Sequence, residues 1–183
     1  MKKLILTAVL STLFTAQAFA ADTDEGGHFN RVEAKYVDVS DYDADVYGLS
    51  FKKSFGNFYA TGDYLRHDHD VAELDQFFVG VGYKHELSNQ VTGFADINYA
   101  KADAGSLYDE SGYAVQAGAI YELNKNFEFS ALVRHVDVEV DAQEFELGAR
   151  YYVNDSFSLS VTYLDGFESI TAEAWMVGAS YHF

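Results

Sequence analysis

Alternation of apolar and polar residues at every second position is the feature that most constrains the fold of this 183-residue chain. In the segment VYGLSFKKSF, Tyr47, Leu49 and Phe51 share one parity, whereas Ser50 and Lys52 share the other. A period of two is typical of a β-strand with one apolar face and one polar face. The alternation therefore predicts an all-β chain.

The same alternation recurs along the rest of the sequence and predicts ten strands of roughly 8–12 residues. Five of the segments are VYGLSFKKSF, FFVGVGYKHEL, YAVQAGAIYEL, FELGARYYV and WMVGASYHF, and their partners are about 29–37, 58–65, 91–100, 127–136 and 156–164. Segments of this length can cross a bilayer on a tilt. Eight strands remain an alternative if one hairpin folds outside the membrane.

The connections between the segments alternate in length. Short turns are expected at FGN, LSNQ, NKN and ND, and longer polar loops at SDYDAD, RHDHDVAELD, KADAGSLYDES, DVEVDAQE and DGFES. Short turns at one end and longer loops at the other are typical of outer-membrane barrels. The fold class that we predict is therefore a single transmembrane, antiparallel, up-and-down β-barrel.

The apolar parity carries aromatic residues at both ends of the strands, with smaller or aliphatic residues between them. Near the long loops these are Tyr36, Tyr47, Tyr64, Phe77, Tyr99, Tyr113, Phe145, Tyr163 and Trp175; near the short turns they are Phe55, Phe58, Tyr83, Tyr121, Phe127, Tyr151, Phe157, Tyr181 and Phe183. Two such belts match the two interfaces of a bilayer. A soluble β-sandwich or lipocalin-like barrel is the alternative. Such a fold would turn the apolar parity into its core, and aromatic belts at both ends of the strands would then serve no purpose.

The opposite parity is polar and nearly balanced in charge. It holds Arg31, Lys35, Lys52, Lys84, Arg134 and Arg150 together with Glu33, Asp63, Asp96, Glu122, Glu128 and Glu146. Charges removed from bulk water persist only when they are paired or hydrated. We therefore expect a charge-paired lumen, and a narrow one, because eight-stranded barrels are just filled by their side chains.

Residues 1–20 are typical of a secretory signal peptide, with Lys2 and Lys3 before a short apolar run and the sequence AFA at its end. The predicted organisation is a signal peptide at 1–20, an acidic N-terminal segment at 21–27 and a barrel at 28–183. The chain has no Cys and a net charge of −17, so disulfides cannot stabilise it and nucleic acid is excluded as a partner.

The C-terminal sequence resembles the sorting signal of small Gram-negative outer-membrane β-barrel proteins of the porin-like superfamily. Gly178, Tyr181 and the terminal Phe183 match that signal, whereas Met176 occupies a position where a polar residue is more usual. The resemblance implies location in the bacterial outer membrane and contact with the barrel-assembly machinery and periplasmic chaperones during biogenesis. It covers 28–183 in architecture, but its specific motif spans only the last ten residues.

The loops offer weaker candidate sites. Their carboxylates could bind divalent cations, although no loop has the residue spacing of a calcium-binding loop, and a solvated acidic rim is the simpler interpretation. His67 and His69 are weak candidates for a metal site or an acid–base pair. Ten-stranded outer-membrane proteases resemble the chain in strand number, but they are longer and no matching motif is found.

From these features we expect a non-enzymatic, porin-like protein without a cofactor, forming at most a narrow passive pore. Its expected partners are outer-membrane lipid and lipopolysaccharide. The first alternative is a plugged scaffold whose acidic extracellular loops bind cations, lipopolysaccharide or a partner, with a role in adhesion or envelope integrity. A weaker alternative is a hydrolase at the rim, which would depend on His67 or His69.

Overall fold

The computed structural model describes residues 27–39, 45–68, 73–105, 109–138, 140–167 and 173–183. A 3-10 turn, η2 (Gly27–Phe29), precedes the strands. These are β1 (Arg31–Val39), β2 (Asp45–Phe55), β3 (Phe58–Asp68), β4 (Glu73–Ser88), β5 (Val91–Asp103), β6 (Asp109–Asn124), β7 (Phe127–Val138), β8 (Val140–Asn154), β9 (Phe157–Gly166) and β10 (Ala174–His182). Among the described residues no helix is long and apolar enough to span a membrane.

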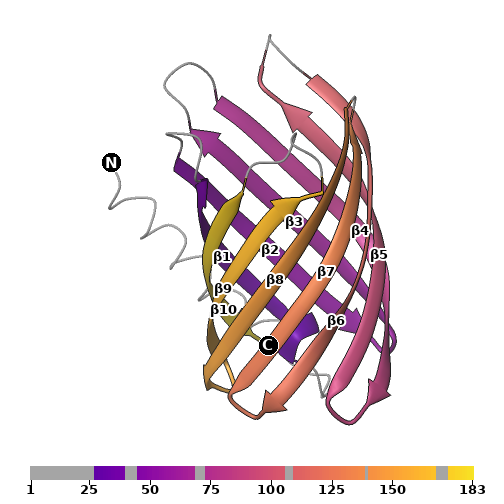
Figure 1. Cartoon of the computed structure of the whole chain (residues 1–183), viewed down its shortest axis with the longest axis vertical. Helices are drawn as coiled ribbons and strands as arrows, with labels where there is room; N and C mark the ends of the chain where they lie inside the picture. Colours follow the sequence, from indigo (N-terminus) through magenta and orange to yellow (C-terminus); the bar gives the residue numbers. More distant parts are fainter. Residues whose placement is uncertain (1–26, 40–44, 69–72, 106–108, 139, 168–172) are drawn as a thin grey trace.

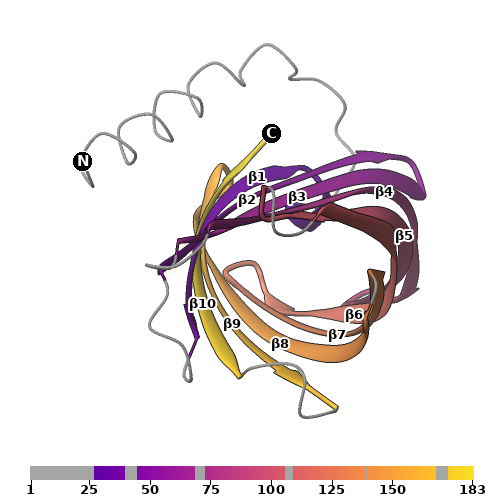
Figure 2. The same ribbon diagram turned by 90° about the horizontal axis from the view of Figure 1, so that it is seen from above.

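The ten strands form one closed antiparallel barrel (Figures 1 and 2). Each strand pairs with its neighbours in sequence, and β1 closes the barrel by pairing with β10 as well as β2. In the register, Arg31 lies opposite both Lys52 and His182. The predicted ten strands are confirmed, and the eight-strand alternative and the sandwich are wrong. Closure also leaves no sheet edge with unpaired backbone groups, as a lipid environment requires.

The four predicted short turns are confirmed and lie together at the lower end of the barrel in Figure 1. In two of them an asparagine organises the turn. Asn124 Oδ1 accepts hydrogen bonds from the backbone N–H of Asn126 and of Phe127, at 2.9 and 3.1 Å, and Asn154 makes the same pair of contacts in its own turn. Side-chain to backbone bonds of this kind replace the lost ladder contacts where the chain reverses.

The strands extend further into the predicted long loops than the alternation indicated. β3 continues to Asp68 and β4 begins at Glu73, so most of RHDHDVAELD is strand, and only residue 139 separates β7 from β8. The sequence-based boundaries at this end are therefore wrong. Backbone pairing continues past the aromatic belt, and some of the charged side chains there contact one another, as Arg66 does with Glu73 and Asp75.

The assignment of the two parities to faces is confirmed. Aromatic residues of the apolar parity contact one another on the outside in two groups, such as Tyr36 with Tyr47 near the long connections and Phe58 with Tyr83 near the short turns, with ring centroids 5.6 and 5.4 Å apart. Between them, Val79 and Leu147 are among many exposed apolar side chains. An apolar outer surface of this kind is suited to lipid and not to water.

The inner face is less uniformly polar than the sequence suggested, because apolar clusters lie at both ends of the lumen. Near the long connections Val37, Val46 and Ala174 pack together. At the opposite end Phe29 is buried against Tyr59, Phe94 and Ile120. The predicted strand start at Phe29 is wrong: Phe29 belongs to η2, which turns into the mouth of the barrel before β1 begins at Arg31.

Candidate functional site: the lumen

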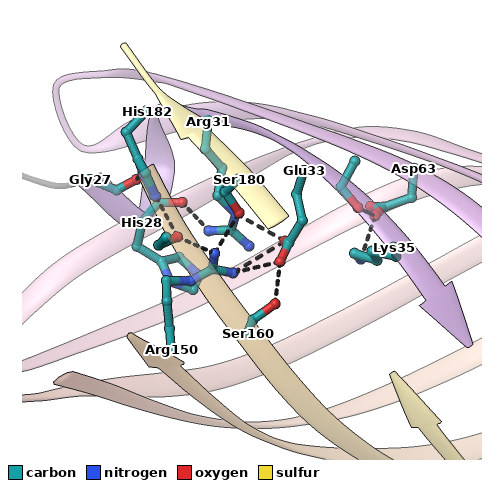
Figure 3. A network of polar contacts seen from close by, with 12 residues as sticks. Gly27, His28, Arg31, Glu33, Lys35, Asp63, Arg150, Ser160, Ser180 and His182 are labelled. Atoms are coloured by element: carbon teal, nitrogen blue, oxygen red, sulfur yellow. Dashed lines mark hydrogen bonds and ion pairs between the residues drawn. The ribbon is translucent and has the colours of Figure 1, made fainter. Parts of the chain in front are cut away.

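The central feature of the lumen is the buried carboxylate of Glu33, which is 2 % exposed. Arg31 Nε donates to Glu33 Oε2 at 3.2 Å, and Arg150 Nη2 donates to both carboxylate oxygens at 3.0 and 3.2 Å (Figure 3). Ser160 Oγ donates to Oε1 at 2.6 Å. The carboxylate thus joins β1, β8 and β9 across the interior through charge-assisted hydrogen bonds.

A second buried carboxylate, Glu128, lies nearer the short-turn end. His28 Nδ1 lies 2.5 Å from Glu128 Oε1, Tyr152 donates its hydroxyl to Oε2 at 2.8 Å, and Arg150 Nε lies 3.7 Å away. Burial lowers the pKa of His28 to about 3, although the Glu128 carboxylate opposes the shift. The imidazole is therefore neutral at pH 7 and donates from Nδ1 to the carboxylate.

Three further ion pairs line the same interior. Lys35 Nζ lies 3.2 Å from Asp63 Oδ1, and Ser50 also donates to this carboxylate. Arg134 contacts Glu146 at 2.7 Å and Glu144 at 3.4 Å. The structure therefore brings part of the predicted charges together, as separate local pairs and small networks.

Asp96 has a different environment, because its partners in the described part of the chain are neutral. Tyr59 OH donates to Oδ2 at 2.5 Å, Asn98 Nδ2 to Oδ1 at 2.6 Å and Gln116 Nε2 to Oδ2 at 2.9 Å. Gln116 also accepts from Arg134 Nε at 2.9 Å and so links the two groups. Sequence reasoning did not select Tyr59, Gln116 or Glu144, although all three lie on the inner parity.

Lys52 and Lys84 have no carboxylate within ion-pair distance among the described residues. Instead Lys52 Nζ lies 5.3–5.6 Å from the ring centres of Phe29, Tyr59 and Phe94. Lys84 Nζ lies 5.1 Å from the Phe29 ring. For these two lysines, cation–π contacts take the place of ion pairs.

A cavity of about 70 Å³ lies between these groups. Its wall includes Lys35, Lys52, Asp63, Arg134 and Glu146. The cavity is large enough for a small ion or a few water molecules and is lined by groups that can bind either. This arrangement can hold small polar species.

The three residues of the predicted assembly signal lie on β10 and at the terminus. Gly178 is on the inner face, where a Cβ would collide with Ser160 Oγ and Glu33 Oε1. Phe183 stacks on Phe51 with ring centroids 6.1 Å apart. The terminus therefore packs against the barrel, as expected, whereas the role of Gly178, Tyr181 and Phe183 in assembly stays a prediction.

The candidate rim site is only partly described. His67 Nε2 lies 3.1 Å from Gln76 Oε1 on β4, whereas His69 lies outside the described residues, as do the predicted signal peptide and most of the 21–27 segment. Within the described ranges no group of three His, Cys, Asp or Glu side chains could hold a metal ion.

Comparison with known proteins agrees with this architecture. The model of a family described as "Putative beta-barrel porin 2" matches residues 66–163, just over half of the chain. No curated protein matches the sequence.

Three solved structures share the fold. The KdgM porin in complex with disordered oligogalacturonate is 12 % identical, with 84 % of this chain and 99 % of that chain covered and a TM-score of 0.51. The NanC porin is 12 % identical, with 84 % of this chain and 100 % of that chain covered and a TM-score of 0.52. An outer-membrane channel from Pseudomonas putida F1 is 7 % identical, with 87 % of this chain and 100 % of that chain covered and a TM-score of 0.54. At such identities the likeness concerns the fold alone.

Proposed function

The chain belongs to the family described as "Putative beta-barrel porin 2", and we propose that it is a non-enzymatic outer-membrane protein that forms at most a narrow passive pore. The observation that carries this proposal is the interior: a cavity lined by both signs of charge lies within a closed barrel whose outer surface is apolar. A lumen of this kind offers hydrated ions a polar path through the bilayer.

The position of Arg134 supports a selectivity role. Arg134 lines the cavity and contacts Glu144 and Glu146, and its guanidinium lies 6.0 Å from the centre of the Phe78 ring. Arg134 is half-buried, so its charge can interact electrostatically with an ion in the lumen. The fold similarity to structures that are themselves named porins or channels also supports a pore.

Replacing Arg134 with glutamine should shift ion selectivity towards cations by several-fold, because one positive charge is removed from the cavity wall while Glu144 and Glu146 remain. The measurement is the reversal potential of single channels in a planar bilayer under a KCl gradient, with the chain refolded in detergent. Lys125→Gln is the matched control, because Lys125 is an exposed residue of the β6–β7 turn outside the lumen.

Steady single-channel steps, with a reversal potential that changes for Arg134→Gln and not for Lys125→Gln, would support the pore. Equal effects of the two substitutions would contradict it. A folded, heat-resistant barrel that stays electrically silent would favour the second candidate, a closed scaffold.

The closed scaffold is favoured by one specific observation, the aromatic turn η2 in the mouth at the short-turn end. In that case the acidic ends of the strands, such as the neighbouring Asp137 and Asp141, would contact cations of lipopolysaccharide or a partner. Substitution of these two aspartates should then abolish the binding of those cations or of that partner, whereas substitution of Arg134 should alter only the stability of the barrel.

A further inference from the structure

Lys52 and Lys84, for which the described part of the chain supplies no carboxylate within ion-pair distance, are the two positive lumen charges that still lack a counter-charge there. Lys52 is 8 % exposed, which places a charged side chain in an interior where Arg31, Lys35, Arg134 and Arg150 all have carboxylates in contact. A buried ammonium is costly unless it finds compensating partners. Phe29, Tyr59 and Phe94 supply only the faces of aromatic rings. Lys52 is also one of the residues that line the central cavity.

An unpartnered hydroxyl lies beside Lys52. Thr61 is directly opposite it on β3, is 4 % exposed, and its Oγ1 has no hydrogen-bond partner in the described structure. Buried hydroxyls are normally hydrogen-bonded, so a lone one calls for an explanation. A second donor that lacks an acceptor therefore neighbours the buried ammonium.

Phe29 covers this group of donors. The Nζ atoms of Lys52 and Lys84 lie 5.6 and 5.1 Å from its ring centre, so the ring lies against both ammonium groups. Phe29 enters from the mouth of the barrel and is not part of a strand. It is therefore a lid over the two lysines that comes from a turn and not from the barrel wall.

Polar contacts around Phe29 hold the lid in place. His182 Nδ1 lies 2.5 Å from the Gly27 carbonyl oxygen, and Arg31 donates to the His28 carbonyl (Figure 3). Asn30 Oδ1 accepts from the backbone N–H and the hydroxyl of Ser54, both at 3.1 Å. His28 adds its contact with Glu128. None of these bonds belongs to the ladder between two strands, so their loss would free the turn and leave the strand pairing intact.

We propose that Lys52, Lys84 and Thr61 form a binding site for a small oxyanion at the short-turn end of the lumen, and that the turn Gly27–Phe29 is a resident plug that covers it. Six ammonium N–H groups and one hydroxyl are then available to an oxyanion such as phosphate or a carboxylate. When the plug is released, the ammonium groups lose their contact with the Phe29 ring and bind the anion instead. This proposal assigns a ligand site to the lumen and does not depend on conduction.

The test is the rate at which a water-soluble acetylating reagent modifies each lysine of the folded, full mature chain, followed by mass spectrometry. Phe29→Ala should raise the rates at Lys52 and Lys84 several-fold. Lys125, exposed in the β6–β7 turn, is the internal control and should react at the same rate in both proteins. In Phe29→Ala, inorganic phosphate at constant ionic strength should slow acetylation of Lys52 and Lys84 and leave Lys125 unchanged.

Equal rates at Lys52 and Lys84 in the native chain and in Phe29→Ala would overturn the plug. Uncovered lysines that phosphate does not protect would overturn the anion site. If Phe29→Ala does not fold, Phe29→Leu keeps an apolar side chain in the mouth and should change the rates in the same direction, and an unchanged rate in that variant would overturn the proposal. Because acetylation needs no current, a silent barrel in the bilayer would contradict the pore alone.

Discussion

Replacement of Glu33 with glutamine is expected to destabilise the barrel by about 3–5 kcal/mol, the usual cost of removing one partner from a buried ion pair. Glu33 is 2 % exposed and accepts hydrogen bonds from Arg31, Arg150 and Ser160. The neutral amide would leave two guanidinium groups without their shared counter-charge. Equilibrium unfolding by urea in detergent or lipid vesicles measures the change.

The matched control is Glu146→Gln. Its carboxylate is less buried, and Arg134 keeps Glu144 as a second acidic partner. We expect a loss of about 1 kcal/mol or less there, as for partly exposed pairs. Similar losses at Glu33 and Glu146 would show that the buried network is not a principal source of stability in the lumen.

An arginine at Val133 is expected to destabilise the folded barrel by about 2–4 kcal/mol in lipid, because a charge near the middle of the bilayer must be removed from water. Val133 is 52 % exposed, and its neighbour on β6 is the small residue Ala117. For a barrel surrounded by water, a surface substitution of this kind would change stability by only about 0.5 kcal/mol. Urea unfolding of the vesicle-inserted protein distinguishes the two cases.

Val153→Arg is the control for depth. Val153 is equally exposed, at 54 %, but lies at the end of β8, past Tyr151 of the aromatic belt. Its arginine can reach the lipid headgroups, so we expect a loss of only about 0–1 kcal/mol. A cost at Val153 equal to that at Val133 would contradict the assigned position of the membrane.

Strand number, closure and the two faces could be predicted from the sequence because each strand repeats the same local signal. From Val91 to Tyr99, the period of two assigns each residue to the outer or the inner face, and this assignment does not require the partner strand to be known. The long-connection ends of the strands could not be predicted, because backbone pairing continues there whatever the side chains are. Asp68 and Glu73 look like loop residues in the sequence and yet lie opposite each other in paired strands.

The candidate site was predictable only in part. The parity placed Glu33 and Arg150 on the inner face, but they are 117 positions apart and their contact depends on the register of the closed barrel. The position of Phe29 could not be predicted, because the alternation extends the first strand to this residue, whereas it belongs to the turn η2. Its burial results from the space that small side chains leave in the mouth: at Gly82, a Cβ would collide with the Tyr59 ring that packs on Phe29.

The most direct test of the account is whether the two parities meet different environments in a bilayer. Because the native chain has no cysteine, single cysteines can be placed at Ser130, Ala131, Val161 and Thr162 and labelled with a small fluorophore in the vesicle-inserted protein. The account predicts strong quenching by brominated lipid at Ala131 and Val161, which face outward, and little at Ser130 and Thr162, which face the lumen. Equal quenching at neighbouring positions, or quenching of the inward pair alone, would contradict a lipid-facing apolar surface around a polar lumen.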